Sequence, residues 1–406
     1  MAIGYLQINV FADNLGQPVE GANLEITGLN TNISTTTNRS GKTDNIELIA
    51  PEKKYSLHPQ SKVKPYSTYS IKASKEGLQK TIVKDVQILP DEISIQNIVM
   101  NSIDETSSPT KTVDIPEHTL WGRSSPKIPE NTIKFDAENT RVLVELKVPQ
   151  VITLHDGIPT NINASNYTIE FPEYIKNIVS NQIYPSWPEE TIKANIYAIT
   201  SFTLNRIHTN WYPSKSYEFT ITSSSAYDQK FVYGRNTFNT INSLVDEFFS
   251  EYIVMNPLKQ PFLAQYDDGI KINNPRWLSK WGSKDLGERG FSAINILKNY
   301  YGSDIVLKQA EIIFNPLNSV PKYNFKLESC GEYIAKIQNK LNLISGSYPD
   351  IPKILKPNGE FMQDTQESVE VFQNIFDLPV TGVVDFATWH KIFYIHSAVL
   401  NMLQGV

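Results

Sequence analysis

The stretch SWPEETIKANIYAITSFTLNRI, residues 186–207, predicts a long helix near the middle of the chain. Ser186 and Glu189 have the spacing of a capping box, in which both side chains accept backbone N–H groups at the start of a helix. Isoleucines recur at helical spacing along one face. Ala194 and Ala198 mark a second face of small residues, which another element can approach closely. We therefore expect a helix that is buried on two sides and organises a domain around it.

Glu190 is the next residue, and the capping box gives it no structural task. A carboxyl group that neighbouring aromatic groups desolvate can serve as a general acid, whereas the helix dipole favours its charged form. The alternative is an ordinary acidic residue that pairs with Lys193 three positions later. Taken without further context, the residues favour the alternative.

Composition indicates a folded protein of several domains. The 406 residues suggest two to four domains, and the net charge of −6 with a mean hydropathy of −0.30 is typical of a soluble chain. The basic excess of a nucleic-acid-binding protein is missing, so we expect no nucleic-acid partner. Cys330 is the single cysteine, which excludes an intrachain disulfide.

The N-terminus alternates like a strand and lacks the basic and apolar regions of a standard signal peptide. No run approaches the roughly 18 apolar residues of a membrane span. We therefore expect no membrane span and no standard export signal.

Four segments differ in pattern and predict a multidomain α+β protein. Residues 1–100 alternate as short strands separated by turns, which predicts an N-terminal β-sandwich. Residues 101–150 are rich in Ser, Thr and Pro and predict a linker and activation segment. Residues 151–318 mix helix and strand patterns, and residues 319–406 have the spacing of a helical domain. The turns GQPVEGA, SGK and KEG of the first segment resemble those of transthyretin-like sandwiches.

The central segment carries three further motifs in a fixed order. They are ITSSSAYDQKFVYGRNTF (residues 221–238), FLAQYDDG (residues 262–269) and WLSKWGSKDLGERGFSAINILKNYYG (residues 277–302). Together with residues 172–194 they resemble the stage II sporulation protein D (SpoIID) family of peptidoglycan lytic transglycosylases. The resemblance implies that Glu190 is the catalytic acid/base, because the family's catalytic glutamate falls there.

The C-terminal segment resembles the three-helix peptidoglycan-binding domain. Its pattern is present as SVEVFQ (residues 368–373), TGVVD (residues 381–385) and the pair Thr388 and Trp389. Packing of a helical core explains the apolar members of this pattern equally well. In their order, the segments resemble the spore cortex-lytic proenzymes, which implies a pro-region, a catalytic domain and a binding domain.

This resemblance implies a reaction that one carboxyl group can serve. The C6 hydroxyl of muramic acid attacks its own anomeric carbon, so Glu190 first protonates the leaving oxygen and then removes the hydroxyl proton. Ordinary glycosidases need two carboxyl groups. The candidate substrate-binding residues are Tyr227, Asp228, Gln229, Tyr266, Lys280 and Trp281. Turn and strand-end hydrogen bonds explain the polar ones equally well, and Trp187, Trp277 and Trp281 either stack on sugars or fill the core.

The resemblance also implies partners, a place and a mode of activation. The expected partners are spore cortex peptidoglycan and a subtilisin-like Csp protease that removes the pro-region during germination. Of the cleavable stretches we favour the bond between Gln150 and Val151. The expected localisation is the cortex and coat region of the spore.

Three departures from the family pattern favour a different class of function. Lys280 stands where the family has glutamine, and Thr200 stands where many members have arginine. Asp267 and Asn274 occupy the places of a cysteine pair that binds zinc in some members, so we expect no metal site. No cofactor motif is present. The alternative is therefore a catalytically weakened relative that binds cortex as a structural or targeting protein. An adhesin-like cell-wall module is a third interpretation.

Overall fold

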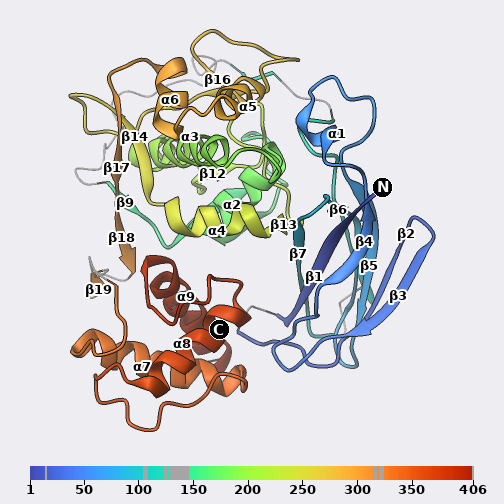
Figure 1. Cartoon of the computed structure of the whole chain (residues 1–406), viewed down its shortest axis with the longest axis vertical. Helices are drawn as coiled ribbons and strands as arrows, with labels where there is room; N and C mark the ends of the chain where they lie inside the picture. The colour runs from blue at the N-terminus through green and yellow to red at the C-terminus, as the bar shows by residue number, and fades with distance from the viewer. Residues whose placement is uncertain are drawn as a thin grey trace.

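The computed structural model describes residues 1–13, 16–103, 108–122, 126–128, 146–314, 318–319 and 324–404. Figure 1 shows three parts in these residues, a two-sheet region in blue, a mixed helix and strand region in green to orange, and a helical region in red. The prediction of a multidomain α+β protein is confirmed.

The N-terminal part is a sandwich of two sheets. One sheet has the strand order β13-β7-β1-β4, and the other has the order β3-β2-β5-β6-β8. Alternate residues of the strands face the shared core, where Leu6, Ile8 and Val10 of β1 are fully buried. The strands other than β13 are β1 (Ala2–Ala12), β2 (Asn23–Gly28), β3 (Thr31–Thr36), β4 (Ile46–Ala50), β5 (Ser67–Ser74), β6 (Lys80–Ile88), β7 (Ile93–Met100) and β8 (Thr110–Asp114).

The predicted linker needs correction, because part of it belongs to the sandwich. Strand β8 pairs in parallel with β6, from Lys80 opposite Thr110 to Lys84 opposite Asp114. Ile115 then enters the sandwich core, and Leu120 is buried in the core of the central part. The Thr and Val side chains of β8 suit a strand, although the Ser, Thr and Pro content of the segment indicated a linker.

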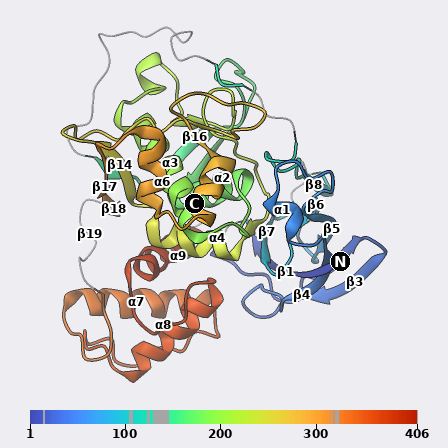
Figure 2. The same cartoon turned by 45° about the horizontal axis from the view of Figure 1, so that its top comes forward.

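The central part is built around one helix, α3 (Glu189–His208), which four other helices and strand β14 contact. Its other helices are α2 (Phe171–Gln182), α4 (Asn239–Phe248), α5 (Lys280–Glu288) and α6 (Ala293–Tyr301), besides the 3-10 turn Pro213–Lys215. Its strands are β9 (Lys147–Val148), β10 (Val151–His155), β11 (Asn166–Glu170), β12 (Ile221–Thr222), β13 (Thr237–Phe238), β14 (Glu251–Met255), β15 (Tyr266–Asp267), β16 (Leu278–Ser279), β17 (Ile305–Gln309), β18 (Glu311–Phe314) and β19 (Asn318–Ser319). Figure 2 shows α3 among α2, α6 and β14.

The predicted burial of α3 is confirmed, whereas its predicted cap is wrong. Ala194 and Ala198 have no exposed surface, as expected of a helix packed on two sides. The helix begins at Glu189 after Pro188 and has no side-chain cap. The hydroxyl of Ser186 lies 2.7 Å from the hydroxyl of Ser56 in the N-terminal part. Ser186 therefore hydrogen-bonds Ser56 and not the first turn of α3.

The C-terminal part consists of α7 (Glu332–Ser347), α8 (Gln363–Ile375) and α9 (Phe386–Gln404). The predicted apolar face of α7 is buried throughout, from Ile334 to Ile344. On α8, Val369 and Phe372 are buried as expected. Helix α9 packs on α4, and the rings of Phe249 and Phe386 lie 5.2 Å apart.

Candidate functional site

Glu190 joins the starts of two helices. Its Oε2 accepts a hydrogen bond of 2.6 Å from the backbone N–H of Ala293, the first residue of α6. Its Oε1 accepts a bond of 3.2 Å from Lys193, and 41% of its side chain is exposed. The positive ends of α3 and α6 and one ammonium group thus surround a carboxylate that solvent still reaches.

Tyr197 lies on the same face of α3 as Glu190, about two turns further along, and it pairs with Glu251. Burial raises the pKa of Tyr197, and the charges of Glu251 and Glu190 raise it further. Burial also raises the pKa of Glu251, which hydrogen-bonds Tyr197. Sequence reasoning missed Glu251 because it lies on β14, about sixty residues away from Glu190 along the chain. A phenol and a second carboxyl group are therefore paired with each other about two helical turns along α3 from Glu190.

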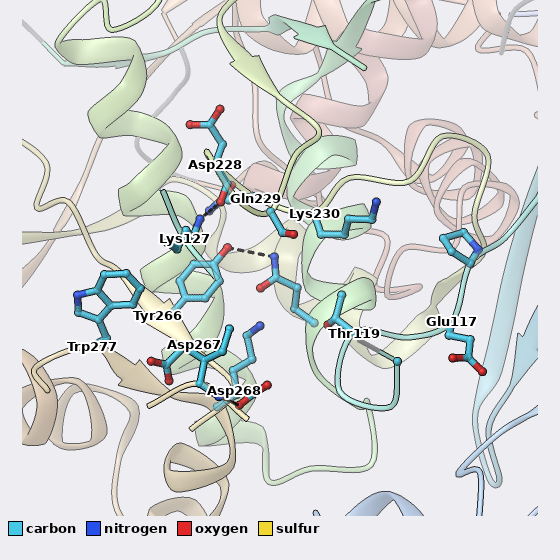
Figure 3. Close-up of a pocket in the computed structure, with 16 residues that line it drawn as sticks. Glu117, Thr119, Lys127, Asp228, Gln229, Lys230, Tyr266, Asp267, Asp268 and Trp277 are labelled. Carbon is cyan, nitrogen blue, oxygen red and sulfur yellow. Dashed lines mark hydrogen bonds between the residues drawn. The ribbon is translucent and has the colours of Figure 1, made fainter. Parts of the chain in front are cut away.

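A separate cavity of about 470 Å³ lies in the central part, and Figure 3 shows its lining. Of the predicted substrate-binding residues, Tyr266, Lys280, Asp228 and Gln229 border it. Among the described residues that line the cavity, Glu190 is not present. The structure therefore does not bring the predicted acid/base into the cavity that the predicted substrate-binding residues share.

Lys280 is the first residue of α5 and is buried at the cavity wall. Burial lowers the pKa of Lys280 to about 8, against the opposing charges of Asp268 and Asp267. Its ammonium lies 5.1 Å from the centre of the Tyr266 ring. Lys280 thus has an aromatic and two acidic neighbours, which explains how this site accepts a lysine.

Ser279, which precedes Lys280, caps helix α5. The hydroxyl of Ser279 accepts a bond of 2.9 Å from the backbone N–H of Gly282. Thr200, at the place of the family's arginine, is completely buried inside α3. Neither Ser279 nor Thr200 is among the described residues that line the cavity.

Asp267 and Asn274, which stand at the places of the cysteine pair, contact each other. The Asp267 Oδ2 accepts bonds of 2.7 Å and 3.0 Å from the backbone and side-chain nitrogens of Asn274. A hydrogen-bonded pair therefore closes the loop between residues 267 and 274. The described residues contain no cluster of potential metal ligands.

Asp228 has a structural role that the sequence did not reveal. Its carboxylate is completely buried and accepts bonds from Arg206 at 2.9 Å and Tyr212 at 2.6 Å. The backbone and side chain of Thr222 donate to the same group. Figure 3 shows the carboxylate pointing away from Tyr266. Both oxygens thus already have buried partners, and the predicted contact of Asp228 with substrate stays a prediction.

The side chain of Gln229 is also hydrogen-bonded to buried groups of the fold. Its Oε1 accepts bonds from Tyr174 at 3.1 Å and Thr203 at 2.9 Å, and its nitrogen donates to the Ile199 carbonyl. Its predicted contact with substrate likewise stays a prediction. Tyr227 is half-buried in the preceding turn and is not among the described lining residues of the cavity.

The three candidate tryptophans separate into two groups. Trp187 and Trp281 are buried against each other, with ring centres 4.8 Å apart, so they fill the core. Trp277 is half-buried and lines the cavity. Of the three, Trp277 alone presents an indole to the cavity. Gln182, Asp268 and Lys127 also line it, although no family motif pointed to them.

The predicted cleavage site lies between two short strands. Val151 begins β10 and is exposed, whereas the carbonyl of Gln150 accepts a bond of 3.1 Å from the backbone of Phe171. A protease that cuts there has to displace this bond.

The FQ pattern of the C-terminal part is explained by the position of Gln373. Its Oε1 accepts 2.9 Å bonds from the backbone of Thr381 and Gly382, and its nitrogen reaches the carbonyl of Val383. Gly382 has a φ of 66°, a conformation that favours glycine. Gln373 therefore holds the turn between α8 and α9.

Residues 330–392, which contain this turn, match the protein family described as "Putative peptidoglycan binding domain". The C-terminal region contains a peptidoglycan-binding domain. A peptidoglycan-binding domain supports association of the protein with the cell wall, with peptidoglycan as a partner. No curated protein matches the chain.

Two solved structures share limited similarity with the chain. "The Bacillus anthracis TIE protein" is 16% identical over 25% of this chain and 17% of that one, with a TM-score of 0.20. GBS52, the minor pilin of Streptococcus agalactiae, is 17% identical over 27% of this chain and 49% of that one, with a TM-score of 0.19. The chain thus spans less than half of either protein's length. No helix of the described residues is long and apolar enough to cross a membrane.

Proposed function

We propose that the protein is a proenzyme of a peptidoglycan lytic transglycosylase of the SleC type, a spore cortex-lytic enzyme activated by proteolysis during germination. Its substrate is the linkage between N-acetylmuramic acid and N-acetylglucosamine, and its product carries a 1,6-anhydro end. Glu190 is the acid/base. The observation that carries the proposal is a solvent-accessible carboxylate at two helix starts, in a chain that also contains a peptidoglycan-binding domain.

In this proposal Glu190 takes part in two proton transfers in turn. As the acid, its carboxyl group donates a proton to the glycosidic oxygen while the bond to the anomeric carbon breaks. The muramic C6 hydroxyl then attacks that carbon, and the carboxylate accepts the hydroxyl proton. The backbone N–H of Ala293 fixes one oxygen, so the other is the one that reacts once Lys193 moves aside.

The phenol of Tyr197 and the carboxyl group of Glu251 are positioned to stabilise charge beside the sugar ring. They hydrogen-bond each other, on α3 and β14, about two helical turns from Glu190. The cavity lined by Trp277 and Lys280 is a second place for the polymer, which extends well beyond one disaccharide.

A second candidate function is a cortex-binding protein of structural or targeting type with little or no catalysis. The observation that favours it is the pair of partners at Glu190, since both carboxylate oxygens already accept hydrogen bonds. The position of Asp228 and Gln229 favours it too, because their side chains serve the fold.

The two functions are distinguished by release of soluble glycan from purified cortex peptidoglycan. The protein used is the full chain with a protease recognition sequence placed between Ile128 and Leu146, before and after cutting. We expect Glu190→Gln to abolish release by the cut protein while binding to insoluble peptidoglycan is unchanged.

Glu189→Gln is the matched control, because the neighbouring glutamate pairs with Lys193 at 2.6 Å and 63% of its side chain is exposed. It should retain nearly full activity. Equal activity of wild type and Glu190→Gln would exclude Glu190 as the acid/base. Binding without any release, followed by a gain of release in Lys280→Gln, would support the second function.

A further inference from the structure

The sandwich and the central part share an interface that is continuous with the cores of both. The short strand β13 of the central part extends a sheet of the sandwich, with Thr237 opposite Ile95 and Phe238 opposite Ser94 of β7. Phe238 is completely buried, and Tyr66 and Leu89 of the sandwich belong to the same apolar cluster. Strand addition combined with apolar burial is a common basis of stable association.

The polar groups of this interface are paired across it. Asn236 and the backbone of Gln87 exchange two hydrogen bonds of 3.0 Å. The guanidinium of Arg235 is 5% exposed and donates to the Gln87 side chain at 3.0 Å. Gln96 donates to the Gly234 carbonyl at 2.9 Å. Separation of the two parts would break all of these bonds together.

Glu92 of the sandwich caps a helix of the central part. Its carboxylate accepts bonds of 2.9 Å and 2.8 Å from the backbone and hydroxyl of Thr240, in the first turn of α4. Glu92 is 8% exposed, so little water competes for it. A carboxylate at a helix N-terminus gains from both the hydrogen bonds and the dipole.

The segment that follows β8 is inserted into the central part. His118 has no exposed surface and lies 4.3 Å from the ring of Tyr184, and the Thr119 hydroxyl donates to the Asn181 carbonyl. Leu120 belongs to the central core. Removal of this segment would leave a gap in that core and unpaired groups on α2.

The sandwich also contacts the peptidoglycan-binding domain. Asp377, in the turn after α8, pairs with Lys42 and accepts bonds of 3.1 Å and 3.0 Å from Gln7. Ser40 donates to Asp350 at 3.1 Å. The sandwich therefore holds both of the other parts.

From these contacts we propose that the sandwich stays bound to the rest of the protein after the connecting chain is cut, so that the processed protein is a complex of two fragments. Cutting removes the tether but none of the contacts described above. Residues 116–122 stay with the sandwich fragment, and Pro116, Glu117 and Thr119 continue to line the cavity. The sandwich is then a permanent subunit rather than a discarded pro-region.

The test uses the full chain with the protease recognition sequence between Ile128 and Leu146. After complete cutting, size-exclusion chromatography at about 1 μM should give one peak that contains both fragments, which requires a Kd well below 1 μM. Two separate peaks would overturn the proposal. The measurement reads mass and not glycan cleavage, so it stands or falls independently of the proposed function.

A variant tests the contacts that carry the proposal. Glu92→Ala should raise the Kd of the cut complex about 10- to 100-fold, since a buried bond to a charged group is lost. Glu25→Ala is the matched control, because Glu25 pairs with Lys72 on the exposed side of the other sheet. An unchanged Kd in Glu92→Ala would refute its role. If that variant does not fold, Gln96→Ala removes the bond to Gly234 and should weaken the complex in the same direction.

Discussion

The sharpest consequence of the structure concerns Asp228, because a substrate-binding role and a structural role predict opposite results. We consider Asp228→Ala. The substitution removes the acceptor for Arg206, Tyr212 and Thr222, all at the end of α3 or close to it. Arg206 is 2% exposed and Asp228 has no exposed surface, so water does not replace the lost partner.

The magnitude follows from this burial. Removal of one partner of a buried ion pair typically costs about 3 to 5 kcal/mol, because the remaining charge is left without compensation. For a domain of 150 to 250 residues, each kcal/mol shifts the Tm by about 2 to 4 °C. The transition of the central part should therefore shift down by roughly 6 to 20 °C.

Differential scanning calorimetry of the full chain measures the shift. Asp285→Ala is the matched control, since its pair with Arg289 is exposed and spans 3.5 Å. Such surface pairs contribute about 0 to 1 kcal/mol, so the control Tm should hardly move. A Tm of Asp228→Ala within the range of the control, together with reduced glycan release, would refute the structural role and restore the substrate-binding one.

Three further predictions concern the other parts of the protein. Gln373→Ala should destabilise the peptidoglycan-binding domain by about 2 to 4 kcal/mol, because the turn at Gly382 loses its acceptor and donor; urea denaturation measures this, and an unchanged midpoint would contradict it. Burial lowers the pKa of His390 to about 3, so the unfolded chain takes up a proton below about pH 6.5 that the folded chain does not. The free energy of unfolding should therefore fall as the pH drops from about 6.5 towards 3, and His390→Phe should reduce that fall in denaturation curves at several pH values. Lys280→Met should raise the Tm near neutral pH, because the cost of burying the charged ammonium disappears. The pKa of Lys280 is about 8 in the folded protein and 10.5 ordinarily, so the stability of the wild type should rise between these pH values. The Tm of the wild type should therefore approach that of the variant over this range.

Local patterns predicted much of the fold. The alternation in β1 and the helical spacing in α7 each specified a buried face, because burial of apolar side chains is a property of single elements. Strand β8 was missed because its composition resembles a linker and its partner β6 lies about thirty residues away. Composition does not reveal such pairing.

The site was predicted less well, for a related reason. Asp228 and Gln229 stand in a family motif, but the partners that engage them come from α2, α3 and the segment after α3. Ser186 has the spacing of a cap, yet it contacts Ser56 of another domain. These side chains are polar, and most of their partners lie on other elements of the fold. Gln373 was part of the SVEVFQ pattern, and its role in the turn follows from its hydrogen bonds in the structure.

The central claim is that glycan is cleaved without water, with Glu190 as the acid/base. The most direct measurement is mass spectrometry of the products released from cortex peptidoglycan by the cut protein in water enriched in oxygen-18. The account predicts 1,6-anhydro ends without the heavy isotope from the wild type and from Glu189→Gln, and no products from Glu190→Gln. Reducing ends that carry oxygen-18 would show hydrolysis, and they would contradict the account.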